Sequence, residues 1–224
     1  MDTGHRPISV VLADHNLLIR QGLRRILEEQ GNMAIVGEAR NAQEALALVQ
    51  ELSPDVLLIN VGLPHLGGIP TIRRVKQAAP QTEVVAISAE AGDQVMAALE
   101  AGAAGYLLAD TEPETLLRVI RGARDGELIM AARPFPGRSG RGTERRTRRF
   151  AEGKAGHLSA REMEILQEIA QGATDREIAA HLTISEATVK THIRSILKKV
   201  KARNRAHAVA RFLGEPGDGA PGQR

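Results

Sequence analysis

Cysteine is absent from the 224-residue sequence, so the chain forms neither disulfide bonds nor thiolate metal sites, as a reducing compartment would permit. The sequence also lacks any run of about 18 apolar residues, which argues against a membrane-spanning helix. Its first residues, MDTGHRPISVV, contain no basic region followed by a long apolar core, so we expect no signal peptide. These absences together predict a soluble, cytoplasmic protein.

Charge is distributed unevenly along the chain. Residues 1–132 contain 11 Lys and Arg against 17 Asp and Glu, whereas residues 133–213 contain 18 against 8. The length of 224 residues accommodates two modest domains. An acidic part followed by a strongly basic part is typical of a nucleic-acid-binding module attached to a domain with another role.

The N-terminal part alternates short apolar runs with amphipathic segments. The expected strands are Ile8–Ala13, Met33–Glu38, Asp55–Ile59, Glu83–Ser88 and Gly105–Leu108. The expected helices are Asn16–Gln30, Ala42–Glu51, Gly68–Ala78, Gln94–Ala101 and Pro113–Arg124. Five such units predict an α/β flavodoxin-like fold, with a parallel sheet of order 2-1-3-4-5 and helices on both faces. The candidate site of such a fold lies at the carboxyl ends of the first and third strands.

The segment SEATVKTHIRSILKKV, residues 185–200, predicts an amphipathic helix with Ser185 as its N-cap. Read at 3.6 residues per turn, it places apolar positions on one stripe and mainly basic positions opposite, namely Val189, Ile193, Ile196, Leu197 and Val200 against Lys190, Thr191, Arg194 and Lys198. A shorter helix over residues 174–182 begins with a capping box formed by Thr174 and Glu177. Two helices this close together predict a helix-turn-helix that enters the DNA major groove, although this segment alone also fits a pair of surface helices with solvated lysines.

Residues 158–212 resemble the LuxR-type four-helix DNA-binding domain. The shared positions are Leu158, Ser159, Arg161, Glu162, Leu166, Gly172, Glu177, Ile178, Ala179, Leu182, Ser185, Thr188, Val189, Lys190, His192, Ile196, Lys199, Arg205 and Ala208. Lys201 and Ala202 depart from the usual Gly-Val pair, which adds charge. The resemblance implies an all-α domain that binds double-stranded DNA, with Lys190, Thr191 and Arg194 in the major groove. The residues implied for phosphate contact or support are Thr188, Lys198, Lys199, Lys201, Arg203 and Arg205.

Four N-terminal segments, VVLADHNLLIRQGLRRIL, SPDVLLINVGLPHLGG, VVAISA and AGAAGYLLADTEP, resemble the receiver domain of NarL/FixJ-family response regulators. Such receivers carry an acidic pair, a phosphoacceptor aspartate, a hydroxyl and a lysine after strands one, three, four and five. The matching residues here are Asp14 with His15, Asn60, Ser88 and Ala109. Since three of the five chemical positions are replaced, the resemblance implies a degenerate receiver.

These replacements have separate physical consequences. The neutral amide of Asn60 is a far weaker nucleophile than a carboxylate, and Ala109 supplies no cation to balance a phosphoryl group. Asp14 is the one anionic ligand left for Mg²⁺, so we expect no metal, no cofactor and no enzymatic activity. Two interpretations of the pocket are considered. In the first it has lost its function, and Asn60 and His15 bond to each other and to the backbone. In the second it is a reshaped site for a small-molecule ligand.

We therefore expect a degenerate receiver over residues 7–126 and a helix-turn-helix domain over residues 157–213. Residues 127–156 are rich in Arg, Gly and Pro and predict a linker. The linker either only connects the two domains, or its seven arginines between Arg133 and Arg149 also contact DNA phosphates. Residues 214–224 predict a frayed tail.

The expected function is sequence-specific transcriptional regulation independent of aspartyl phosphorylation, controlled by a ligand or by dimerisation. A small helix-turn-helix offers few base contacts, which favours a homodimer on two half-sites. The receiver surfaces considered for that dimer are residues 94–124 or 16–30. A conventional phosphorylation-dependent regulator and an interaction module that sequesters another regulator are the alternatives.

Overall fold

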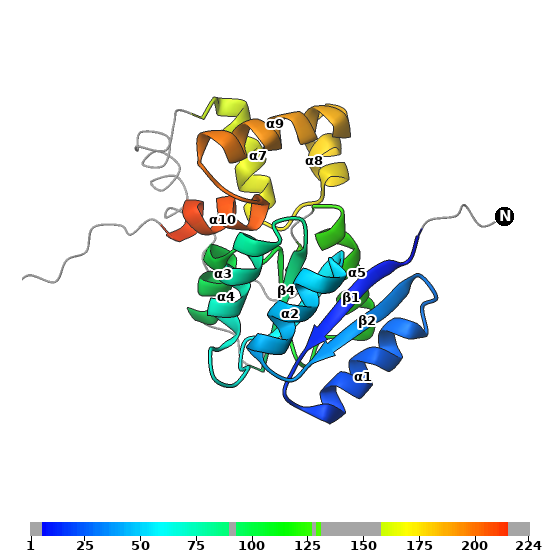
Figure 1. Ribbon diagram of the computed structural model, residues 1–224. Coiled ribbons are helices and arrows are strands. Elements are labelled where there is room, and N and C mark those ends of the chain that lie inside the picture. Colours follow the sequence, from blue (N-terminus) through cyan, green and yellow to red (C-terminus); the bar gives the residue numbers. More distant parts are fainter. Residues whose placement is uncertain (1–5, 90–92, 127–128, 131–157, 215–224) are drawn as a thin grey trace, which may run out of the picture. The chain divides into compact units, whose positions relative to one another are not determined.

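A computed structural model describes residues 6–89, 93–126, 129–130 and 158–214 of the chain (Figure 1). The chain divides into two compact units, Met1–Pro134 and Phe135–Arg224, and this division falls within the predicted linker. Most of that linker and the predicted tail lie outside the described residues. None of the helices in the described ranges is long and apolar enough to span a membrane.

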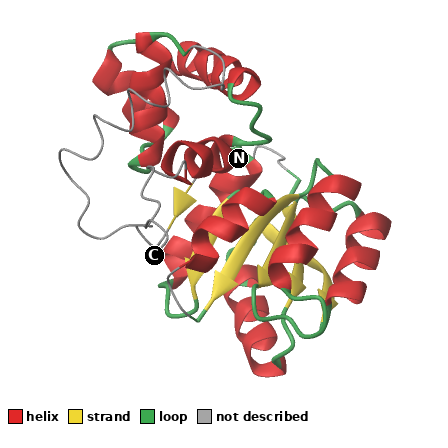
Figure 2. Ribbon diagram, turned by 90° about the vertical axis from the view of Figure 1, so that its left-hand side faces the viewer, coloured by secondary structure: helices red, strands yellow, loops and turns green. Residues whose placement is uncertain are grey.

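The first unit is a parallel sheet with helices on both faces (Figure 2). Its strands are β1 Ile8–Ala13, β2 Met33–Ala39, β3 Val56–Asn60, β4 Glu83–Ser88, β5 Gly105–Leu108 and β6 Ile129–Met130. Its helices are α1 Leu17–Glu28, α2 Ala42–Leu52, α3 Gly68–Ala78, α4 Asp93–Ala101 and α5 Pro113–Arg124. All ten predicted elements are present, and their bounds shift by no more than two residues.

The strand order is β2-β1-β3-β4-β5-β6, so the predicted order of the first five strands is confirmed. The short strand β6 was not predicted. It pairs parallel with β5, with Gly105 opposite Ile129 and Tyr106 opposite Met130. Residues 129 and 130 therefore extend the receiver sheet, although we had expected the linker to begin at residue 127.

Alternate residues of the central strands are buried on opposite faces of the sheet, which explains why these strands read as continuous apolar runs. One face carries Val10, Leu12, Leu58 and Val85, which form a single cluster with Leu27 of α1 and with Leu116, Leu117 and Ile120 of α5. The intervening residues, such as Val11, Leu57 and Ile59, are also fully buried. The α2, α3 and α4 helices supply further buried apolar side chains, including Val49, Ile72, Val75 and Leu99.

The loop from β3 to α3 makes a close backbone turn next to Asn60. The Gly68 N–H donates to the Val61 carbonyl at 3.0 Å. A Cβ at position 68 would lie 2.4 Å from the Val61 Cα and 2.5 Å from the Asn60 carbonyl oxygen. Only glycine fits this approach, which fixes the backbone that leaves the carboxyl end of β3.

The second unit is all-α, as predicted. Its helices are α7 Ala160–Ala170, α8 Asp175–Leu182, α9 Glu186–Lys199 and α10 Arg205–Gly214. Fully or nearly fully buried side chains from all four helices form its core, among them Ile165, Leu166, Ile178, Val189, Ile196, Val209 and Phe212. The α9 helix contacts the other three helices, so its orientation depends on each of them.

Candidate functional site

The α9 helix has one buried face and one cationic face, as its sequence predicts. Ser185 is the N-cap, and its hydroxyl accepts a hydrogen bond from the Thr188 N–H at 3.1 Å. Val189, Ile193 and Ile196 are buried, whereas the basic side chains opposite them are exposed. Because the apolar stripe is anchored in the core, the opposite stripe is held outward in a fixed direction.

The α8 helix and the turn after it place α9 relative to the core. Thr174 and Glu177 form the predicted capping box, in which the Glu177 carboxylate accepts from the Thr174 N–H at 2.8 Å. Thr183 adopts a left-handed backbone conformation, with φ 54°, and ends α8. The next helix begins three residues later, which gives the short connection typical of a helix-turn-helix.

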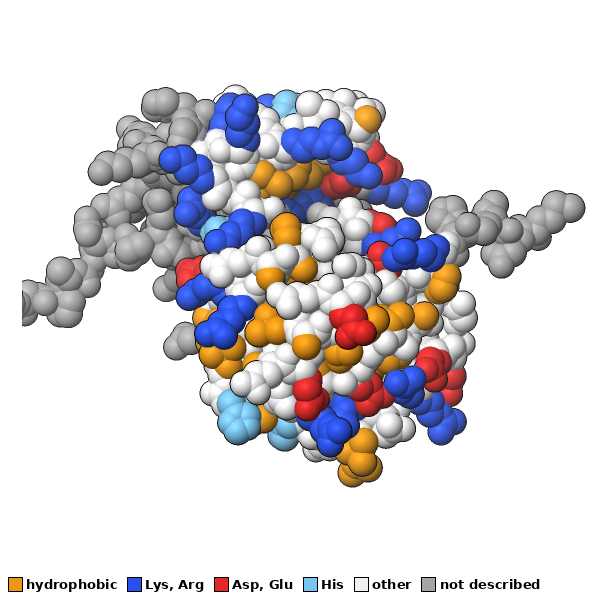
Figure 3. All heavy atoms as spheres, in the orientation of Figure 1, with side chains coloured by type: hydrophobic (Ala, Val, Ile, Leu, Met, Phe, Trp, Pro, Cys, Tyr) orange, Lys and Arg blue, Asp and Glu red, His pale blue; other side chains and the backbone are white. Residues whose placement is uncertain are grey.

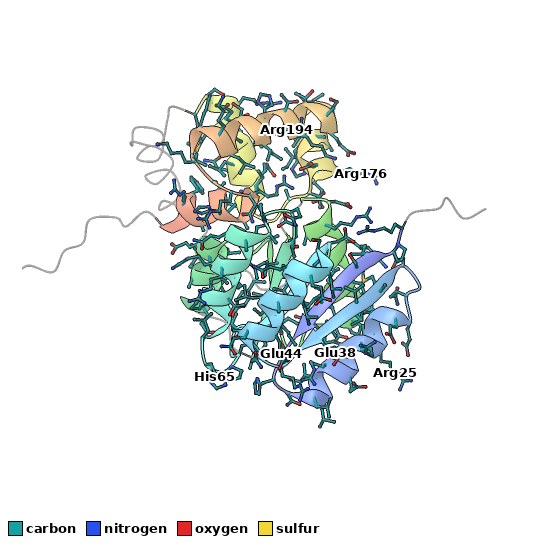
Figure 4. All side chains as sticks on the ribbon, viewed as in Figure 1. Arg25, Glu38, Glu44, His65, Arg176 and Arg194 are labelled. Carbon is teal, nitrogen blue, oxygen red and sulfur yellow. The ribbon has the colours of Figure 1, made fainter. Side chains whose placement is uncertain are left out.

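The three residues predicted to read bases lie on the exposed face of α9. Lys190, Thr191 and Arg194 are all exposed. The Thr191 hydroxyl donates to the Ala187 carbonyl at 3.0 Å and keeps its acceptor capacity. Lys and Arg side chains gather over α8 and α9 (Figure 3), and Arg194 of α9 lies on the same unit as Arg176 of α8, an exposed residue that we did not predict (Figure 4).

The residues predicted for phosphate contact or support fall into two groups. Lys198, Lys201 and Arg203 are exposed, while Thr188 is half-buried and hydrogen-bonds through its hydroxyl to Ser185 at 2.9 Å. Lys201 continues the chain beyond α9 in a left-handed conformation, with φ 52°. Lys199 and Arg205 differ from this pattern, because their charged groups pair with carboxylates inside the domain.

Lys199 is bound to a carboxylate at the start of α7. Its ammonium donates to Glu162 Oε2 at 2.7 Å, and Ser195 of α9 donates to Glu162 Oε1 at 2.6 Å. Burial alone would raise the pKa of Glu162, but the hydrogen bonds from Lys199, Ser195 and Ser159 outweigh it and lower that pKa from 4.5 to about 2. Glu162 is therefore ionised at neutral pH.

Arg205, predicted for phosphate contact or support, forms a buried ion pair. Its guanidinium donates to Asp175 Oδ1 at 2.6 Å, and the two residues are only 4% and 5% exposed. The pair joins the first turn of α10 to the first turn of α8. A guanidinium in this position links the two helices and is almost fully removed from the surface.

Several residues that hold this unit together have roles that the sequence pattern does not indicate. Arg161 donates to the Leu182 carbonyl at 2.6 Å and thereby satisfies a backbone oxygen at the end of α8. Ser159 and Glu162 form a second capping box, and its Ser-x-x-Glu spacing is visible in the sequence. The partners of Ser195, Asp175 and Arg161 lie 21 to 33 residues away, and no local pattern indicates such pairs.

A direct hydrogen bond joins two of the residues predicted for the receiver pocket, Asn60 and Asp14. Asn60 Nδ2 donates to Asp14 Oδ2 at 2.7 Å, and the Gly62 N–H donates to Asn60 Oδ1 at 2.7 Å. These contacts fix the amide orientation, because the flipped amide would put two donors together at Gly62 and two acceptors together at Asp14. Asp14 is buried, and its Oδ1 accepts from the Asn16 N–H at 2.7 Å.

The other predicted pocket residues surround this pair. His15 is exposed and places Nδ1 3.6 Å from Asp14 Oδ1, so the bond expected between His15 and Asn60 is replaced by contacts of each with Asp14. Ser88 is buried, and its hydroxyl donates to Gln94 Oε1 at 3.3 Å. Ala109 is exposed, and its N–H donates to the Ser88 carbonyl at 2.8 Å.

The donor set of this pocket does not fit a divalent cation. Mg²⁺ prefers several anionic oxygen ligands in octahedral geometry, and Asp14 is the one carboxylate among the five pocket residues. The Asn60 amide presents its hydrogens, and not its oxygen, toward Asp14. Within the described ranges, moreover, no cluster of three or more His, Asp or Glu residues could hold a metal ion.

Comparison with known families agrees with both resemblances. Residues 10–121 match the response regulator receiver domain, and residues 156–212 match the bacterial regulatory proteins of the luxR family. A receiver joined to such a domain defines the class of DNA-binding transcriptional response regulators. The chain belongs to the NarL family of this class.

Full-length relatives share both parts. The transcriptional regulatory protein YxjL of Bacillus subtilis (strain 168) is 36% identical over 203 residues, covering 90% of this chain and 93% of that protein. The nitrate/nitrite response regulator protein NarL of Escherichia coli (strain K12) is 32% identical over 207 residues, covering 92% and 95%. The solved structure of the response regulator ChrA of a heme-sensing two-component system is 31% identical with a TM-score of 0.50, covering 93% of this chain and all of that one.

Proposed function

We propose that this chain is a sequence-specific transcriptional regulator that works without aspartyl phosphorylation. The observation that carries the proposal is the hydrogen bond from the Asn60 amide to Asp14. A phosphoryl acceptor at this place must be an ionised carboxylate beside a bound cation. Here the acceptor position is a neutral amide, and its N–H group already bonds to Asp14 Oδ2. We further propose that the chain is not an enzyme and acts in the cytoplasm, where its DNA lies.

The arrangement of α9 supports a division of labour on DNA. Lys190, Thr191 and Arg194 face outward from the same side of the helix, where basic side chains can donate to guanine in the major groove. Lys198, Lys201 and Arg203 lie at or beyond the C-terminal end of α9, where contacts to phosphates would fix the register. Thr188, Lys199 and Arg205 are better explained as supports, since their polar groups bond within the domain.

A homodimer is the assembly that best suits this DNA-binding domain, because two copies double the few base contacts that one copy makes. Of the two receiver surfaces considered, the exposed apolar side chains favour α1. Leu17, Leu18 and Ile19 are 57%, 80% and 39% exposed in its first turn, and no comparable side chain is exposed in the described parts of α4, β5 and α5. A Leu18→Asp variant is expected to lower the dimer fraction in sedimentation velocity across concentrations, and unchanged association would exclude this surface.

The polar groups of the pocket favour a self-contained remnant over a ligand site. Asp14, Asn60 and the backbone of Gly62 and Asn16 satisfy one another at distances of 2.7 Å. A small molecule that entered here would have to replace these bonds, and this cost argues against control by a ligand. We accordingly favour control by dimerisation.

The central test treats the purified protein with acetyl phosphate and Mg²⁺ and then measures its intact mass and its binding to DNA. We expect no added mass and the same affinity for DNA with and without the donor. A related receiver with its acceptor aspartate serves as the positive control. A gain of about 80 Da, the mass of one phosphoryl group, would contradict the proposal and support the alternative of a conventional phosphorylation-dependent regulator. Failure to bind any duplex at low salt would favour the sequestering module instead.

A further inference from the structure

The first turn of α7 contacts both helices of the helix-turn-helix through two consecutive residues. Arg161 donates to the carbonyl of Leu182, the last residue of α8. Glu162 accepts hydrogen bonds from Ser195 and Lys199, which both belong to the C-terminal half of α9. A single dipeptide therefore joins the end of α8 and the end of α9 to the same turn of α7.

Glu162 is held in place before it reaches α9. Its N–H donates to the Ser159 hydroxyl at 3.2 Å, and its Oε2 accepts from the Ser159 N–H at 2.7 Å. Both carboxylate oxygens are engaged, and the residue is only 4% exposed. Because the carboxylate is fixed by its own capping box, it can act as a rigid anchor for the side chains that donate to it.

Lys198 and Lys199 are neighbours in sequence but face different surroundings. Lys198 is exposed, and no described partner holds its ammonium. The Lys199 ammonium lies 2.7 Å from the nearly buried Glu162 carboxylate. The charge of Lys199 is already balanced by Glu162, and a phosphate that drew the ammonium away would leave a buried carboxylate without its counter-charge, which is costly.

We propose that Arg161 and Glu162 are positioning residues for base recognition. Their bonds to Leu182, Ser195 and Lys199 form a clamp that holds α8 and α9. Lys199 belongs to this clamp and does not contact phosphate. The inference rests on the proposed reading of bases by α9. A helix is stiff, so a shift of α9 at Ser195 and Lys199 also moves Arg194 and Lys190, which lie earlier in the same helix. Base contacts depend on this alignment more strongly than phosphate contacts do, because a bidentate pair with a base edge has a narrow geometry.

The first experiment compares Lys199→Gln with Lys198→Gln in the full-length chain. Both variants lose one positive charge on the same turn of α9. Affinity for a mixed-sequence duplex is measured over a range of salt concentrations. Lys198→Gln is expected to reduce the slope of log K against log salt by about 0.9, the value for one phosphate contact. Lys199→Gln is expected to leave the slope unchanged, and Lys199→Arg should behave as the unaltered chain.

The second experiment measures discrimination between sequences. The unaltered protein selects a preferred duplex from a random pool, and each variant is then tested on this duplex and on its scrambled form. Glu162→Gln is expected to lower the ratio of the two affinities by about five- to a hundredfold, the discrimination of one base contact. Glu114→Gln is the control for the loss of one negative charge, because this exposed glutamate belongs to α5 of the first unit and not to the helical unit. Ser195→Ala, which changes no charge, is the variant of choice if Glu162→Gln melts below the assay temperature.

Two results on DNA would overturn the proposal. The first is a flatter salt slope for Lys199→Gln, equal to that of Lys198→Gln. The second is an equal loss of affinity on the selected and scrambled duplexes for both Glu162→Gln and Ser195→Ala. If the unaltered chain bound no duplex, the proposed function itself would fail. The clamp is then tested by thermal unfolding of Glu162→Gln, Lys199→Gln and the double variant, where additive effects would count against it.

Discussion

The Arg205 guanidinium and the Asp175 carboxylate meet at 2.6 Å inside the helical unit, where both side chains are almost fully buried. The pair spans 30 residues of sequence and joins the first turns of α8 and α10. A buried pair of this kind contributes little over an apolar pair of similar size, but the loss of one partner leaves an uncompensated charge.

Asp175→Asn is therefore expected to lower the free energy of unfolding of the helical unit by about 3–5 kcal/mol. Thermal unfolding followed by circular dichroism measures the change. Arg176→Gln is the control, since Arg176 is the adjacent exposed residue and its replacement should change stability by less than about 0.5 kcal/mol. Equal melting temperatures for the two variants would contradict a stabilising role for the pair.

The exposed face of α9 gives a prediction about specificity. Arg194→Ala is expected to relax sequence preference by about 1–3 kcal/mol, because Arg194 faces outward at the centre of the basic stripe. Lys201→Ala is expected to weaken binding to all duplexes about equally and to flatten the salt dependence. Fluorescence anisotropy with a selected and a scrambled duplex separates the two effects. The division of labour would be wrong if both variants lost affinity equally on the two duplexes.

The lowered pKa of Glu162 predicts how the helical unit responds to acid. A carboxyl group with a depressed pKa in the folded state stabilises the fold fully above its unfolded pKa of 4.5, and this stabilisation is lost as the pH falls toward about 2. The difference corresponds to about 3 kcal/mol. Urea unfolding of the chain between pH 6 and 2.5 is expected to show this decline in the helical unit. Glu162→Gln should remove that part of the decline, and an unchanged pH profile in this variant would refute the assignment.

The bond between Asn60 and Asp14 predicts the effect of restoring an acidic residue. Asn60→Asp places a second carboxylate within about 3 Å of buried Asp14, so repulsion is expected to destabilise the receiver at pH 7 by about 1–3 kcal/mol and less at pH 5. Millimolar Mg²⁺ should recover part of this loss, because two carboxylates can share the cation. Melting temperatures with and without Mg²⁺ measure both effects. Asn60→Ser is the neutral control and should show no response to Mg²⁺.

The strands and the recognition helix could be predicted because each follows from a local period. The continuous apolar runs of β1, β3 and β4 are buried on both faces, and the 3.6-residue stripe of α9 separates Val189 from Lys190. Three replaced positions of the receiver pocket were likewise visible in the sequence. The hydrogen bond between Asn60 and Asp14 was not visible in the sequence, because it depends on how the ends of β1 and β3 lie next to each other in the sheet.

The roles of Lys199 and Arg205 could not be predicted from the same patterns. Lys199 is the last residue of α9 and Arg205 is the first residue of α10, and at a helix end periodicity does not separate a solvated cation from a paired one. Their partners are 37 and 30 residues away. Strand β6 was missed for a different reason, since two residues are too few to establish a period of two.

The pairing of β6 with β5 has a consequence for any dissected form of this protein. A fragment that stops at residue 126 removes Ile129 and Met130 and leaves the backbone amides and carbonyls of β5 without their neighbour on that side. An exposed edge strand of this kind favours the addition of a strand from another molecule. Self-association of such a fragment would then be an artefact of the truncation and not a property of the full-length chain. A fragment that ends after Met130 keeps β6 at the edge of the sheet.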